Sequence, residues 1–65
     1  MAHSNIMEAE NMNRYRIVIS GLSFRYFLGY YYAESPDDAK RQAWAKHCSS
    51  FRDCSINMLS AIMEN

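Results

Sequence analysis

The chain has 65 residues, 49% of them hydrophobic and 14% aromatic, and its seven basic and seven acidic side chains cancel. This length accommodates one domain, and the apolar content is too high for a disordered protein. Zero net charge argues against a protein that coats nucleic acid or an anionic membrane. No apolar run approaches the ~20 residues that span a bilayer, and residues 1–10 lack the pattern of a secretory signal.

The first residues are polar and net acidic through Glu8 and Glu10, and they lack apolar periodicity. We therefore expect a flexible N-terminal tail over residues 1–12 and a single domain over residues 13–65. Two cysteines, Cys48 and Cys54, are too few for the disulfide framework of a small secreted domain. We expect free thiols and a cytoplasmic location.

Residues 14–20 predict a β-strand, because three consecutive β-branched residues occur there within a period-two alternation. Tyr15, Ile17 and Ile19 fall on one face, and Arg14, Arg16, Val18 and Ser20 fall on the other. Gly21 follows in a short turn, where a glycine is free to take a positive φ.

Residues 24–33 predict a second strand that is rich in aromatic side chains. Strict alternation places Phe24, Tyr26, Leu28, Tyr30 and Tyr32 on one face. The opposite face then carries Arg25, Phe27, Gly29, Tyr31 and Ala33. A glycine inside a strand, here Gly29, indicates a β-bulge or a close approach of the helix.

A helix begins after Ser35, which is suited to be the N-cap, and Pro36 suits its first position. Asp37 and Asp38 lie in the first turn, where the positive end of the helix dipole stabilises negatively charged side chains. The helix should run to about Ser49. Ala39 and Ala43 form a seam of small residues that permits close packing on a sheet.

Residues 54–63 fit a strand by alternation and a helix by spacing of three and four. We favour a strand, because a lone hairpin under one helix is unstable. The expected fold is α+β: a two-layer ββαβ domain whose antiparallel sheet has the strand order 2-1-3. The alternative is ββαα.

No constellation in the sequence predicts catalysis, so we expect a non-enzymatic protein without cofactor or metal. His47 and Cys48 are adjacent, so on a helix they point about 100° apart and do not form a dyad. A zinc site would need His3 from the tail in addition to His47, Cys48 and Cys54, at a spacing that fits no compact knuckle. The acidic residues Glu34, Asp37 and Asp38 are explained by the helix start.

The aromatic strand is the feature that indicates a function. One helix covers one face of a three-stranded sheet, so the other face is open or meets another chain. Tyrosine and arginine are enriched at interfaces. The expected function is protein binding, to a partner or a second copy in a homodimer, although solvated tyrosines on an ordinary open sheet are an alternative. The expected contact residues are Tyr26, Tyr30, Tyr31, Tyr32, Arg14, Arg16 and Arg25. Because the covered face is not fixed by the sequence, some of these tyrosines must be core.

The second functional hypothesis is nucleic-acid binding. Strand aromatics flanked by Arg14, Arg16 and Arg25 could stack on bases and contact phosphates, as in sheet-faced RNA-binding modules. The neutral chain and the absence of the glycine-containing signature of those modules place this hypothesis second.

The run Tyr-Tyr-Ala-Glu-Ser-Pro-Asp-Asp-Ala-Lys-Arg-Gln-Ala, residues 31–43, resembles the strand-to-helix junction of very small ββα(β) proteins of bacteriophages. Some of those are anti-defence proteins, including anti-CRISPR inhibitors that dock on a host complex. The resemblance covers residues 13–63 in layout and the junction alone in sequence. It implies a phage-type inhibitor that acts by stoichiometric binding in the bacterial cytoplasm, and it assigns no functional residue.

Overall fold

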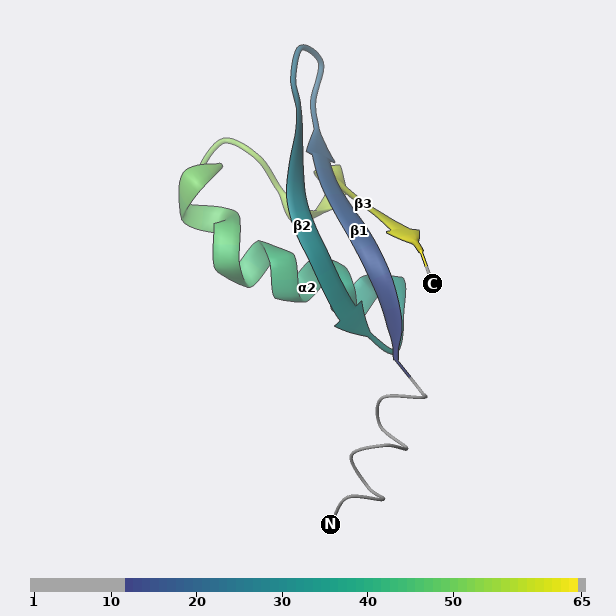
Figure 1. Cartoon of the computed structure of the whole chain (residues 1–65). Helices are drawn as coiled ribbons and strands as arrows, with labels where there is room; N and C mark the ends of the chain where they lie inside the picture. Colours follow the sequence, from purple (N-terminus) through teal and green to yellow (C-terminus); the bar gives the residue numbers. More distant parts are fainter. Residues whose placement is uncertain (1–11, 65) are drawn as a thin grey trace.

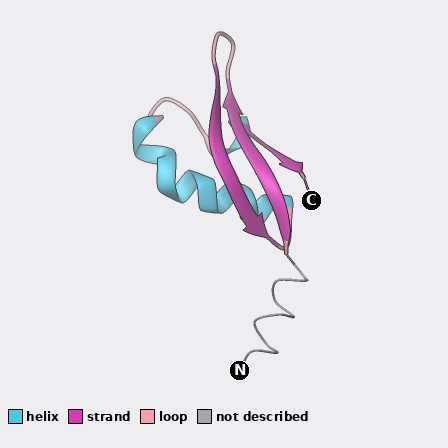
Figure 2. Cartoon of the chain, viewed as in Figure 1, coloured by secondary structure: helices cyan, strands magenta, loops and turns pink. Residues whose placement is uncertain are grey.

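The computed structural model describes residues 12–64, which form a three-stranded antiparallel sheet with one α-helix across one face (Figures 1 and 2). Strands β1 (Asn13–Ser20), β2 (Arg25–Ala33) and β3 (Leu59–Met63) lie in the order β2-β1-β3. Helix α2 (Pro36–His47) follows β2. This arrangement confirms the predicted ββαβ fold with its strand order and rules out ββαα. The predicted tail lies, apart from Met12, outside the described residues.

The chain between α2 and β3 contains two short 3₁₀ turns, η1 (Cys48–Ser50) and η2 (Ile56–Met58). The expected strand over residues 54–63 is therefore wrong in its first half. Met58 N–H donates to the Ser55 carbonyl at 3.0 Å, which closes a turn where alternation predicted extended backbone. Only five residues remain to pair with β1, from Tyr15↔Met63 to Ile19↔Leu59.

A β-bulge in β2 shifts its register against β1. Ile17 pairs with Gly29, but the next residue, Val18, pairs with Phe27, so Leu28 is the extra residue. Gly29 has φ 115°, a conformation that L side chains rarely adopt. The predicted bulge is confirmed. Because of the bulge, alternation changes phase at Leu28. The prediction that residues 24, 26 and 28 share a face with Tyr30 and Tyr32 is therefore wrong, and Phe27 shares that face instead.

The core lies between α2 and the face of the sheet that carries Tyr15, Ile17 and Ile19. Beside them lie Leu28 and Ala33 from β2 and Leu59 from β3; Ile17 and Ile19 are fully buried. Phe24, Tyr31, Trp44, Phe51, Cys54, Ile56, Met58 and Ala61 pack around this cluster. On the helix side, Ala39 and Ala43 are completely buried, which confirms the seam of small residues.

The predicted start of the helix is confirmed at atomic detail. Ser35 is the N-cap, and its Oγ accepts the Asp38 N–H at 3.2 Å, while Pro36 occupies the first turn. At the hairpin, Gly21 N–H donates to the Phe24 carbonyl at 3.0 Å. Gly21 does not take a positive φ. A glycine is needed there for a different reason, because a Cβ atom would collide with the ring of Phe24.

Candidate protein-binding surface

The face of the sheet opposite α2 is not covered by any element among residues 12–64 (Figure 1). The pairing places Arg14 beside Tyr32, Arg16 beside Tyr30, and Val18 between Phe27 and Ser60. We call this surface the open face. Its residues are Arg14, Arg16, Val18, Arg25, Phe27, Tyr30, Tyr32, Ser60 and Ile62.

Large apolar side chains on the open face remain accessible. Phe27, Tyr30 and Tyr32 are 56%, 48% and 60% exposed, and Ile62 is 38% exposed. The rings of Phe27 and Tyr30 meet edge to face, with centroids 5.3 Å apart. Val18 is 5% exposed but does not belong to the core cluster, so the side chains of the open face bury it from the other side.

Arginines hold one edge of this aromatic group in place. The Arg14 guanidinium carbon lies 4.7 Å from the centroid of the Tyr30 ring, a cation–π geometry. Arg14 Nε also donates to the Glu64 carbonyl at 3.0 Å. Arg16 Nε lies 3.4 Å from the Glu64 carboxylate. A partly exposed ion pair of this kind contributes little to stability, so its main effect is to orient Arg16 along β1.

The structure brings together five of the seven predicted contact residues, namely Tyr30, Tyr32, Arg14, Arg16 and Arg25. Tyr31 lies on the opposite side, packed against the core, and its hydroxyl contacts Leu28 and His47. Burial raises the pKa of its phenol above the usual 10.0. Tyr31 is therefore a core residue; the sequence requires some of the expected contact tyrosines to be core but does not indicate which.

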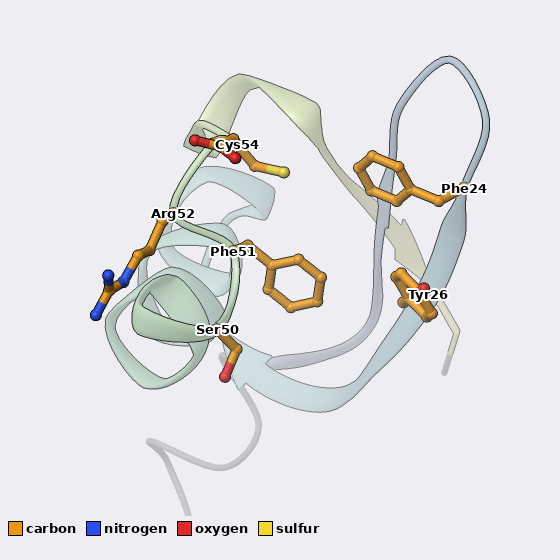
Figure 3. A pocket seen from close by; sticks show the side chains of 7 residues that line it. Phe24, Tyr26, Ser50, Phe51, Arg52 and Cys54 are labelled. Atoms are coloured by element: carbon orange, nitrogen blue, oxygen red, sulfur yellow. The ribbon is translucent and has the colours of Figure 1, made fainter.

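Tyr26 is also separated from the open face, although it is 55% exposed. Because of the bulge, it lies on the helix side of the sheet, beyond the end of α2. Its ring stacks on Phe24 with centroids 5.7 Å apart and meets Phe51 at 5.8 Å. Figure 3 shows the Phe51 ring directed toward these two rings, with Arg52 pointing away from them. The shallow hollow they line is an extension of the core cluster.

Sequence reasoning missed two accessible apolar residues of the open face, Phe27 and Ile62, and the neighbouring Glu64, which contacts two of its arginines. Strict alternation puts Phe27 on the opposite face from Tyr30, because it takes no account of the phase change at the bulge. The signal was present in Gly29, since a bulge of one residue exchanges the faces on one side of it. Nothing in the sequence pattern indicated that Glu64 would contact both Arg14 and Arg16, 50 and 48 positions away.

Within residues 12–64, no group of three His, Cys, Asp or Glu side chains is arranged to hold a metal ion. Cys48 is exposed, Cys54 is half-buried, and both are free thiols. His3, the fourth member of the zinc set considered above, lies outside the described residues. No helix in the described part of the chain is both long and apolar enough to cross a membrane.

The fold and the open face define a small two-layer α+β protein with one covered and one accessible sheet face. Comparison with protein families, curated proteins and solved structures finds no significant match.

Proposed function

We propose that this chain is a non-enzymatic protein-binding module that contacts its partner through the open face. The observation that carries the proposal is the group of three accessible aromatic rings, Phe27, Tyr30 and Tyr32, on one face of the sheet. Aromatic and arginine side chains dominate the binding energy of protein interfaces. Strand positions and the contacts within this group restrict the rings before binding, which lowers the entropy lost on association.

The chemistry of the open face indicates the kind of partner surface it fits. Apolar rings occupy the β2 side and the arginines Arg14, Arg16 and Arg25 flank them. A complementary surface has an apolar centre and acidic groups at its rim. The resemblance of residues 31–43 to phage proteins supports a finer proposal, that the partner is a host macromolecular complex and that binding inhibits it stoichiometrically.

Nucleic-acid binding is the second candidate function, because the same face combines aromatic rings with three arginines. Two observations favour a protein partner over nucleic acid. Arg14 Nε already donates to the Glu64 carbonyl, Arg16 Nε lies 3.4 Å from the Glu64 carboxylate, and the whole chain carries no net positive charge. Affinity for phosphates depends on such charge.

The test compares two tyrosines of similar exposure on opposite sides of the sheet. Tyr32→Ala removes a ring from the open face, whereas Tyr26→Ala removes one from the helix side, at 60% and 55% exposure. Tagged wild type and both variants are used to capture partners from nuclease-treated bacterial lysate, and thermal melting confirms that each variant is folded. A protein recovered stoichiometrically by wild type and by Tyr26→Ala, but not by Tyr32→Ala, supports the proposal.

Two other outcomes contradict it. Equal recovery of the same protein by wild type and Tyr32→Ala would exclude the open face as the contact surface. Recovery of RNA in a parallel capture without nuclease treatment, in a form that is lost at moderate salt, would instead favour nucleic-acid binding. An affinity loss of ~2 kcal/mol or more is expected for a tyrosine at the centre of a protein interface.

A further inference from the structure

Strand β3 forms backbone hydrogen bonds with β1 along one edge, and its other edge pairs with no strand of residues 12–64. Glu64 N–H donates to the Arg14 carbonyl at 2.8 Å, so Arg14 and Glu64 form a hydrogen-bonded pair of the antiparallel ladder. Such pairs alternate along two strands. The backbone N–H and C=O groups of Ser60 and Ile62 are therefore the ones that point toward β1. The N–H and C=O groups of Leu59, Ala61 and Met63 point outward, at the edge where Figure 1 shows no further element of residues 12–64.

The other edge of the sheet, formed by β2, is protected. Gln42 Nε2 from α2 donates to the Tyr32 carbonyl at 3.0 Å, and the Tyr31 hydroxyl donates to the Leu28 carbonyl at 3.2 Å. The bulge at Leu28 also distorts the strand, and Arg25 places a charge at its start. Side-chain caps, bulges and charges are the devices by which proteins prevent pairing of edge strands.

Within residues 12–64, the β3 edge has none of these devices. Its sequence, Leu-Ser-Ala-Ile-Met, contains no charge, proline or glycine. No hydrogen bond or ion pair of the described residues involves a side chain of this strand. The nearest charge, Glu64, is directed toward Arg16 on its own sheet, with 3.4 Å between Nε and the carboxylate. A regular, uncharged and unpaired strand is a template for another strand.

We propose that β3 pairs antiparallel with β3 of a second copy of the chain, across a two-fold axis at Ala61. In this register Ala61 faces Ala61 of the other copy and Leu59 faces Met63, and these pairs form about six backbone hydrogen bonds. Ser60 lies opposite Ile62, so no like charges are juxtaposed. A two-fold axis requires a self-complementary patch, and this strand satisfies that requirement.

The pairing joins two three-stranded sheets into one sheet of six strands. Both copies of the open face then lie on the same side, with Ile62 and Ser60 at the junction. The inference deepens the proposed function by making the contact surface bivalent, but it is carried by the backbone of β3 and does not depend on that function.

Two variants with charges of opposite sign on β3 test the pairing. One double variant carries Ser60→Lys and Ile62→Lys, and the other carries Ser60→Glu and Ile62→Glu. Each alone places like charges opposite each other at two symmetric positions, so its dimer dissociation constant should rise about tenfold. An equimolar mixture should form heterodimers, because every opposed pair is then of opposite sign. Sedimentation velocity from micromolar to high micromolar concentration, with one variant fluorescently labelled, measures all three samples.

The mixture is the decisive sample, because restored association requires that both variants are folded. Thermal melting of each variant alone confirms this independently. A wild-type chain that remains monomeric throughout the concentration range overturns the proposal, as does a dimer that is indifferent to both double variants.

Discussion

The hydroxyl of Tyr31 lies 3.1 Å from Nε2 of His47 and joins the sheet to the last turn of α2. The same hydroxyl is 3.2 Å from the Leu28 carbonyl, which only accepts hydrogen bonds. The phenol proton is therefore directed at Leu28, and the His47 Nε2–H donates to the phenol oxygen. One side chain thus connects the bulge in β2, the covered side of the sheet and the C-terminal end of the helix.

Tyr31→Phe should lower the free energy of unfolding by about 1 kcal/mol at pH 7, since it removes these hydrogen bonds and keeps the ring. Burial raises the pKa of the Tyr31 phenol above its value in the unfolded chain. The stabilisation is therefore complete below about pH 10 and is lost as the pH rises through the raised pKa. The difference between wild type and Tyr31→Phe should shrink above pH 10, as measured by urea denaturation at several pH values. Tyr32→Phe, at an exposed position, should show neither effect.

Gly29→Ala should destabilise the protein by about 1–3 kcal/mol, because an L residue is strained at φ 115°. The new Cβ would find ordinary contact distances, with the nearest atom of Tyr31 at 3.6 Å, so strain in the backbone is the cause. Urea denaturation measures the loss. Stability equal to wild type would show that the bulge relaxes without a positive φ.

Ala43→Leu should cost about 1–3 kcal/mol, because Ala43 is completely buried between α2 and the sheet and has no room for a larger side chain. Ala45→Leu makes the same substitution two residues further along the helix at an exposed position. It should change the stability by less than ~0.5 kcal/mol. Equal effects at the two positions would contradict the packing of α2 described above.

Ser35→Ala should destabilise the protein by about 1 kcal/mol, through loss of the hydrogen bond from the Asp38 N–H to Oγ. Ser55 offers a matched control. It precedes the 3₁₀ turn η2 as its N-cap but makes no side-chain capping bond. Ser55→Ala should therefore leave the melting temperature nearly unchanged, and a comparable loss at both serines would show that capping is not the cause.

The fold was predictable because each local signal agreed with the others. Alternation around Ile17, the N-cap at Ser35 and the seam at Ala39 and Ala43 each specify an element and its buried side. The C-terminal segment was less certain, since residues 54–63 satisfy two periodicities at once. Its first half forms turns, because these residues carry the chain from the end of α2 to the far edge of the sheet.

The binding surface was only partly predictable. The sequence indicates that tyrosines and arginines of the hairpin form a contact surface, and it contains the glycine that marks the bulge. Which tyrosines share a face depends on the exact residue at which alternation changes phase, and that is set by pairing with β1. Tyr26 and Tyr31 consequently lie on the covered side, while Phe27 joins Tyr30 and Tyr32 on the open face.

The extra residue in β2 also determines how this strand responds to a change of length. Deleting Leu28 would leave Gly29 opposite Ile17 and Phe27 opposite Val18, so Arg25, Tyr26 and Phe27 would keep their present sides of the sheet. Losing the bulge while keeping Leu28 would instead shift residues 25–28 by one position against β1 and exchange their sides. The bulge therefore accommodates one residue of chain length without changing which side chains form the open face.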